Sequence, residues 1–251
     1  MSRFFTILVL PFAMVSQDKK PPPKPAAPSV LYAVPLVAKP GEKQKLVLRG
    51  LGLAGVKSVK ASGASNTKVL GAKTVNVPPN YPADRVGDSQ VEIELELPKN
   101  AKTGEVKLTA VSQGGESLPY TLLVRDSLPA IVEKEPNDSF AQAQAVSVPC
   151  AIEGSIQSER ESDVYQFSGK QGEKIRIEVQ AARFGSPLDA LIVLHGPSRA
   201  VIASADDTDG STDPALDVTL PSAGIYHLSV IDARDLGSSH FFYRLILRRD
   251  Q

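Results

Sequence analysis

Hydrophobic and polar residues alternate with a period of two along much of this chain. From Val91 to Leu97 the apolar residues Val, Ile, Leu and Leu alternate with three glutamates, and similar alternation recurs at 175–179 and 226–230. In a β-strand successive side chains point to opposite faces, so each of these segments buries one face and exposes the other. The pattern therefore predicts half-buried strands in antiparallel sheets.

Up to position 126 the sequence predicts about seven short strands separated by turn residues. Turns such as Pro40-Gly41 and the glycine-rich segment 50–55 fall at the spacing expected for an immunoglobulin-like sandwich, without the cysteine and tryptophan of antibody domains. The expected strands are 29–37, 44–49, 56–61, 68–77, 91–97, 105–112 and 120–125.

A second series of strands follows a short link, and about eight antiparallel strands over this length suit a jelly-roll-like sandwich. The expected strands are 150–156, 164–168, 174–181, 190–195, 200–204, 216–220, 225–232 and 241–248. One helix is expected at Asn137 to Val146, where Asp138 or Ser139 could cap several Ala and Gln residues. The predicted fold class is all-β, with an immunoglobulin-like sandwich followed by a jelly-roll-like sandwich.

The N-terminal segment predicts export. Arg3 precedes an apolar run from Phe4 to Val15, which is shorter than the roughly 20 residues that a membrane helix needs. We expect a signal peptide at 1–16, with its cleavage point left open, and no membrane span in the mature chain. The expected order is then a Pro/Lys-rich spacer at 17–28, the first sandwich at 29–126 and the second at 127–251. A secreted or cell-envelope location follows, in the periplasm or outside the cell.

The charge distribution also changes near residue 126, between the two expected sandwiches. The net charge is zero, but 17 basic and 10 acidic residues lie up to Asp126, against 11 basic and 18 acidic residues after it. The lysines of the basic half are scattered along predicted strands without interleaved aromatic residues, which argues against a nucleic-acid partner. The acidic half is the better place to look for a cation site.

Nothing in the sequence indicates an enzyme. The three histidines lie in no recognisable catalytic motif, and the one cysteine, Cys150, sits in an apolar segment that predicts a buried small hydrophobe. A single cysteine also means that no internal disulfide forms. We therefore expect a non-catalytic protein that depends on packing or on a metal ion for its stability.

Four segments of the second half resemble a known family. They are Glu-Pro-Asn-Asp at 135–138, Asp-Val-Tyr-x-Phe at 163–167, Ser-Pro-Leu-Asp at 186–189 and Ala-Gly-Ile-Tyr at 223–226. Over about 132–247 the chain resembles the bacterial pre-peptidase C-terminal domain, which is related to the collagen-binding modules of clostridial collagenases and is often attached to secreted proteases. A weaker resemblance, over 28–125, is to transcription-factor-type immunoglobulin-like domains.

The acidic segment at the start of the second half predicts a calcium site. Calcium prefers six to eight oxygen ligands, and Glu133, Glu135, Asn137 and Asp138 supply oxygens beside a strand that begins near Asp163. One ion could pin the link to the sandwich. The resemblance implies further ligands from the turn before that strand, where Glu161 is present but Arg160 replaces an acid. The alternative is an Asx turn within a solvated acidic linker.

A second acidic cluster has two interpretations. It could form another cation loop, with a further aspartate brought alongside by strand pairing, or it could be an acidic hairpin turn, which we favour slightly. It does not match the ligand positions of an EF-hand. The residues concerned are Asp189, Asp206, Asp207, Asp209 and Asp213.

These features together predict a secreted, non-catalytic accessory or binding protein whose second sandwich is stabilised by Ca²⁺. The partner would be an extracellular protein or polysaccharide. In the collagen-binding relatives exposed aromatic residues bind the ligand, and Phe241, Phe242 and Tyr243 are the nearest equivalents, although core packing suits them better. The alternatives are a structural spacer of the cell envelope, or a stand-alone remnant of a secreted protease that assists folding or substrate binding.

Overall fold

The computed structural model describes residues 25–208 and 210–249. The expected signal peptide at 1–16, residues 17–24 of the expected spacer and Asp209 lie outside this part of the chain. No helix within the described residues is long and apolar enough to cross a membrane.

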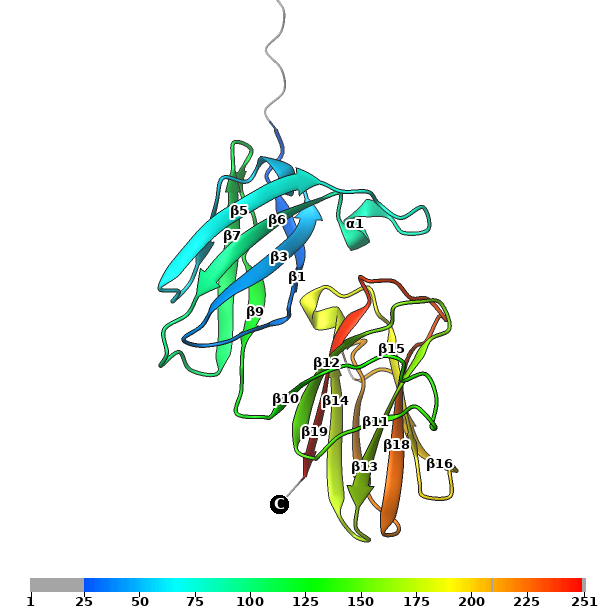
Figure 1. The fold of residues 1–251 in the computed structure, drawn as a ribbon. Helices are drawn as coiled ribbons and strands as arrows, with labels where there is room; N and C mark the ends of the chain where they lie inside the picture. Colours follow the sequence, from blue (N-terminus) through cyan, green and yellow to red (C-terminus); the bar gives the residue numbers. More distant parts are fainter. Residues whose placement is uncertain (1–24, 209, 250–251) are drawn as a thin grey trace, which may run out of the picture.

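The first sandwich pairs a four-stranded sheet with a five-stranded sheet (Figure 1). Its inner faces meet in a core that includes Leu46, Leu48 and Ile93 from one sheet and Leu108 and Leu122 from the other. The four-stranded sheet has the order β1 (Ser29–Val34), β3 (Lys43–Leu51), β6 (Ser89–Glu96), β5 (Asn66–Thr74). The five-stranded sheet has the order β2 (Val37–Ala38), β9 (Tyr120–Val124), β7 (Gly104–Ser112), β4 (Ser58–Ala61), with β8 (Gly115–Glu116) pairing with β7.

The second sandwich consists of two five-stranded sheets. Tyr165, Phe167 and Tyr226 from one sheet pack in its core against Ile177 and Leu245 from the other. One sheet has the order β10 (Ala130–Val132), β12 (Cys150–Ser155), β19 (Phe242–Arg249), β14 (Lys174–Gln180), β17 (Ala215–Thr219). The other has the order β11 (Gln144–Ala145), β13 (Ser162–Gly169), β18 (Gly224–Asp232), β15 (Ala190–His195), β16 (Val201–Ala205).

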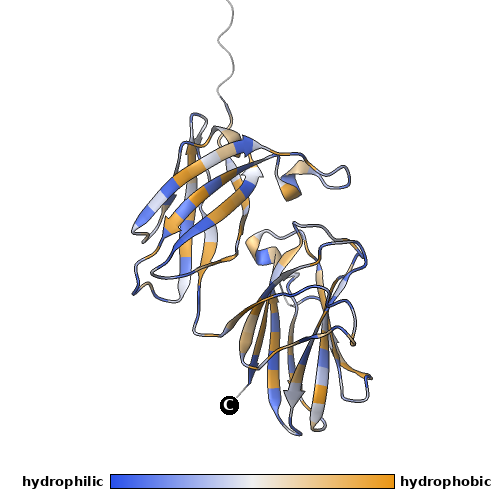
Figure 2. Ribbon diagram, in the orientation of Figure 1, coloured by the Kyte–Doolittle hydropathy of each residue, from blue (hydrophilic) through white to orange (hydrophobic). Residues whose placement is uncertain are grey.

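The period-two pattern explains these strands. Figure 2 shows hydrophobic and hydrophilic residues alternating along β3, β5 and β6, and in β6 every second residue is buried. The expected strands of both halves are present with ends shifted by a few residues, so the all-β prediction is confirmed. The short helical elements are η1 (Leu53–Gly55), α1 (Ala83–Val86) and η2 (Ala182–Phe184).

The prediction of a helix at Asn137 to Val146 is wrong. This segment forms turns and then β11, which pairs in parallel with β13 through Gln144 and Tyr165. Helix propensity is a weak preference that tertiary contacts override. Here Asn137 is fully buried and its carbonyl oxygen accepts the Val164 N–H at 2.9 Å, which holds the chain extended along β13.

The two sandwiches pack against each other through a third apolar cluster. It joins Tyr32, Leu36 and Val37 of the first sandwich to Phe184 and Phe242 of the second. Two tyrosine hydroxyls cross the boundary: that of Tyr32 lies 2.5 Å from His240 Nδ1, and that of Tyr120 donates to the Phe184 carbonyl at 3.0 Å. An ion pair of 2.9 Å joins Asp126, between the sandwiches, to Arg244 of β19. These contacts fix the relative position of the two sandwiches.

Candidate metal centre

The chain enters the second sandwich along the edge of one sheet and then crosses to the other. β10 runs parallel to β12, with Ala130 opposite Ala151 and Val132 opposite Glu153. The segment 133–138 then passes the end of β12 and reaches the start of β13. The backbone therefore places the acidic residues of this segment beside Asp163, near the beginning of β13, as the sequence predicts.

The predicted ligands form two groups that share one carboxylate. Oxygen atoms of Glu133, Glu135 and Asp163 lie within 4.8 Å of one another, and so do oxygen atoms of Glu135, Asp138 and Glu161. The first group is the more buried and is called the inner group below. The second, the outer group, lines an open cavity beside Arg160. The arrangement has room for two cations, one in each group, bridged by the Glu135 carboxylate.

Two buried oxygens of the inner group lack hydrogen-bond donors. Asn137 and Asp163 are both fully buried, and neither Asn137 Oδ1 nor Asp163 Oδ1 accepts a hydrogen bond from the described residues. The Asn137 amide nitrogen instead donates to Glu133 Oε1 at 3.3 Å, and its backbone N–H donates to Glu135 Oε2 at 3.1 Å. A buried polar atom without a partner costs free energy, so these oxygens need a hydrogen-bond donor or a cation.

Two tyrosines bridge the carboxylates of the inner group. Tyr165 Oη lies 2.6 Å from Glu133 Oε1 and 2.6 Å from Tyr243 Oη. Tyr243 Oη in turn lies 2.9 Å from Glu133 Oε1 and 2.5 Å from Asp163 Oδ2. Two hydroxyls carry only two protons for these four contacts. With both carboxylates ionised the cluster is therefore short of hydrogen atoms, and it needs either an added proton or a cation.

Burial and like charge both favour the added proton when no metal is bound. Desolvation, followed by the charge of Glu133, raises the pKa of Asp163 to about 10. Desolvation and then the charge of Glu133 also raise the pKa of Glu135. A divalent cation reverses this effect, because it stabilises the ionised carboxylates at close range.

The donor set fits a hard cation such as calcium. All candidate ligands offer carboxylate or amide oxygen, which Ca²⁺ prefers, and none offers the sulfur or imidazole nitrogen that transition metals favour. Glu133, Glu135, Asn137 and Asp163 would hold an ion in the inner group. Asp138 and Glu161 would complete the outer group, where Arg160 lies close and adds an opposing positive charge.

The second predicted cluster comes together only in part. Oxygens of Asp189, Asp206 and Asp207 lie within 4.8 Å of one another, but Asp189 already pairs with Arg234 at 3.4 Å, and Asp206 and Asp207 are exposed. Asp209 lies outside the described residues. No oxygen of this cluster is among the buried atoms without a partner.

Asp213 was wrongly grouped with the second cluster. Its side chain is fully buried and points to the chain around η2, where Oδ1 accepts the N–H groups of Ala181 at 3.1 Å and Ala182 at 2.7 Å. Its other oxygen accepts Arg183 Nε at 2.6 Å. Both oxygens of the carboxylate are hydrogen-bonded within the chain, and Asp213 lies apart from the group formed by Asp189, Asp206 and Asp207.

The three aromatic residues at the start of β19 do not form an exposed platform. Phe241, Phe242 and Tyr243 are all buried. Phe242 packs between the sandwiches, and Tyr243 belongs to the inner group's hydrogen-bond network. Sequence reasoning gave Tyr165 and Tyr243 no role at the metal centre. The available signal was the Asp-Val-Tyr segment, in which the tyrosine lies on the same face of β13 as Asp163.

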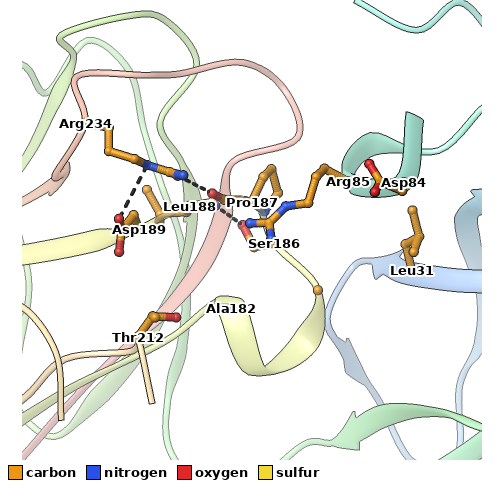
Figure 3. A pocket seen from close by; sticks show the side chains of 11 residues that line it. Leu31, Asp84, Arg85, Ala182, Ser186, Pro187, Leu188, Asp189, Thr212 and Arg234 are labelled. Atoms are coloured by element: carbon orange, nitrogen blue, oxygen red, sulfur yellow. Dashed lines mark hydrogen bonds and ion pairs between the residues drawn. The ribbon is translucent and has the colours of Figure 1, made fainter. Parts of the chain in front are cut away.

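A polar cavity of about 420 Å³ lies at the boundary of the two sandwiches. Figure 3 shows Arg85 extending from α1 toward Ser186 and Pro187, and Arg234 held by Asp189 and the Pro187 carbonyl. Positive and negative side chains both line this cavity. Because Arg234 is already paired and the charges are mixed, the cavity selects no ligand class by charge.

Fold and site together define a two-sandwich protein with a partly buried acidic cluster at the entrance of its second sandwich. Residues 161–231 match the family model of the bacterial pre-peptidase C-terminal domain. The second sandwich therefore contains a domain of this family, and the resemblance seen in the sequence is confirmed. The resemblance of residues 28–125 to transcription-factor-type immunoglobulin-like domains stays a prediction.

Individual proteins also show similarity. A probable subtilase-type serine protease of Deinococcus radiodurans is 33% identical over 109 residues, which are 42% of this chain and only 15% of the relative. The pre-peptidase C-terminal domain of a Bacillus anthracis collagenase covers 47% of this chain and 100% of its own, at 18% identity and a TM-score of 0.34. The periplasmic lysozyme inhibitor PliG of Aeromonas hydrophila covers 48% of this chain and 99% of its own, at 17% identity and a TM-score of 0.32.

Proposed function

We propose that this protein is a secreted, non-catalytic accessory or binding protein whose second sandwich is stabilised by calcium at its entrance. The observation that supports the calcium site most directly is the pair of buried oxygens, Asn137 Oδ1 and Asp163 Oδ1, that accept no hydrogen bond beside the Glu133 and Glu135 carboxylates. A bound ion would satisfy both oxygens and would tie the segment 133–138 to β13. The link between the sandwiches would then be fixed at both of its ends.

The described residues support a non-catalytic role. The Nδ1 atom of His240 forms a hydrogen bond with the Tyr32 hydroxyl, and His195 and His227 pack against the ring of Phe140. Burial raises the pKa of the Cys150 thiol to about 11, which suppresses the thiolate that a nucleophile needs. The sequence of the N-terminal segment supports export, and the partner that we propose is an extracellular protein or polysaccharide.

The calcium proposal is tested by thermal unfolding in calcium and in chelator. A ligand that binds only the folded state at a hundredfold excess over its Kd adds about 2.7 kcal/mol, which for a chain of this size is roughly 5 to 10 °C in Tm. We expect this difference for the wild type and its loss in Asp163→Asn. The matched control is Asp217→Asn, which removes an exposed carboxylate that pairs with Arg176 on the same sandwich.

Equal melting temperatures in calcium and chelator would refute the calcium site, and so would an undiminished calcium effect in Asp163→Asn. An equal loss in Asp217→Asn would show that the effect is general screening of acidic charge and not binding at the entrance.

A role beside a secreted protease is the second candidate function. The subtilase-type relative supports it, because the matched region is a small part of a much longer protease chain. The test is to add the purified protein to a refolding subtilase-type protease and to follow recovered activity. A higher yield than with an equal mass of Asp163→Asn would favour this candidate, and an unchanged yield would count against it.

A further inference from the structure

A second cavity between the sandwiches differs from the polar one. It has a volume of about 320 Å³ and opens beside the chain that enters the second sandwich. The first sandwich contributes the turn between β1 and β2, and the second contributes the ends of β10, β12 and β19 and adjacent loops. We call it the junction pocket, and its lining residues are Val34, Pro35, Leu36, Val132, Glu133, Glu153, Gly154, Ser155, Gln157, Ser239, Phe242 and Tyr243.

The walls of the junction pocket include several apolar side chains, and two of these remain exposed. Val34 is 43% exposed on the first sandwich, and Val132 is 72% exposed on the second. Few large apolar side chains of the described residues are as exposed as these two. Leu36 and Phe242, by contrast, are buried in the cluster that joins the sandwiches. The pocket is therefore preformed by a fixed boundary and carries apolar surface that no part of the described chain covers.

Every charged side chain that lines the junction pocket is acidic. These are Glu133 and Glu153. Glu133 is engaged, because Oε2 accepts the Ser155 N–H at 2.9 Å and Oε1 accepts the tyrosine hydroxyls. The Glu153 carboxylate forms no hydrogen bond or ion pair with the described residues, so it is the group available to a ligand.

Three cations lie near Glu153 without forming an ion pair with it. Desolvation raises the pKa of Glu153, and the charges of Arg244, Lys39 and Arg125 oppose this effect. None of these three cations lines the pocket, and Arg244, opposite Glu153 on β19, is held by Asp126 at 2.9 Å. The carboxylate is thus half-buried, and no cation lines the pocket with it.

We propose that the junction pocket binds a lysine or arginine side chain presented by a partner protein. The aliphatic stem would pack against Val34, Val132 and Phe242, and the cationic end would pair with Glu153. An anionic ligand would meet two carboxylates. A purely apolar side chain would bury Glu153 further without pairing it, which is costly.

The volume supports a single side chain as the ligand. Pockets for small organic ligands span about 300 to 1,000 Å³, and the junction pocket lies at the lower end of this range. A larger ligand such as an oligosaccharide would fill a larger cavity. A long basic side chain on the surface of a partner matches both the size and the mixed apolar and acidic lining.

The test is an NMR titration of the full ¹⁵N-labelled protein, saturated with calcium. The probes are N-acetyl-lysine methylamide, N-acetyl-arginine methylamide and the uncharged analogue N-acetyl-norleucine methylamide. We expect the two basic probes to shift the amide signals of Gly154, Ser155 and Gln157, and the norleucine probe to bind roughly tenfold more weakly because it lacks the charge-assisted hydrogen bond. In Glu153→Gln the basic probes should bind no better than norleucine does.

Two further variants make the result specific. Glu178→Gln removes a carboxylate from the neighbouring strand β14, outside the pocket, and should leave binding unchanged. Val132→Ser alters only an exposed wall and should weaken the basic probes even if Glu153→Gln does not fold. Equal binding of norleucine and lysine, or shifts that map outside the pocket, would overturn the proposal. Neither result affects the calcium melts, so the two proposals fail separately.

Discussion

Two buried aspartates of the second sandwich, Asp163 and Asp213, are satisfied in opposite ways. Asp213 receives backbone N–H groups at both ends of its carboxylate and the Arg183 side chain as well. Asp163 receives only the Tyr243 hydroxyl, and its other oxygen receives nothing from the described residues. Burial is complete in both. Where the chain supplies the donors, a buried carboxylate organises the fold; where it does not, the carboxylate requires a proton or a cation.

The largest expected effect is the loss of stability in Asp213→Ala, which should not depend on calcium. Asp213→Ala leaves several N–H groups and the Arg183 guanidinium without an acceptor, and we expect it to lower the free energy of unfolding by about 3 to 5 kcal/mol. Urea unfolding should give the same loss in calcium and in chelator. A loss confined to calcium would mean that Asp213 belongs to a metal site after all.

The stability of Asp163→Asn relative to the wild type should depend on calcium. A hundredfold excess of the ion should stabilise the wild type by about 2.7 kcal/mol and leave the variant, which lacks a ligand, unchanged. In chelator at pH 8 the variant should be more stable than the wild type by about 1 to 3 kcal/mol, because a neutral amide replaces a carboxyl whose ionisation is unfavourable. Urea unfolding of both proteins measures the difference, and destabilisation of equal size in both conditions would contradict the account.

The pH dependence in chelator should follow from the same carboxyl. Burial raises the pKa of Asp163 to about 10, so the protonated form fits the fold. Its contribution is full below the unfolded-state pKa near 4 and is lost as the pH rises toward 10. From pH 6 to 9 the wild type should lose stability relative to Asp163→Asn by at most about 1.4 kcal/mol per pH unit. Parallel pH profiles for the two proteins would contradict this prediction.

The smallest effect concerns the tyrosines that bridge the inner group. Tyr165→Phe removes the hydroxyl that lies 2.6 Å from Glu133 Oε1, and we expect a loss of about 1 to 2 kcal/mol in chelator. Calcium should reduce this loss, since the ion would then stabilise the same carboxylate. As a control, Tyr81→Phe removes a hydroxyl near the sandwich boundary and should show no dependence on calcium.

The contrast between Asp163 and Asp213 also shows which features of the structure could be predicted from the sequence. Alternation along β6, β14 and β18 predicted the strands because the period of two is a local signal. The grouping of 133–138 with Asp163 was also accessible, because the family resemblance marked both segments. Asp213 was misplaced because its contact with 181–183 is equally distant in the chain, about 30 residues, and no motif of the resemblance marked it. The helix expected at 137–146 failed because burial of Asn137 outweighs helix propensity.

Calorimetric titration of chelator-treated protein with calcium tests the central claim most directly. The account predicts saturable binding for the wild type, loss of that binding in Asp163→Asn, and retention in Asp207→Asn, which alters only the exposed second cluster. Binding that survives Asp163→Asn but disappears in Asp207→Asn would place the ion at the second cluster and contradict the account. Absence of binding to the wild type would contradict the metal centre altogether.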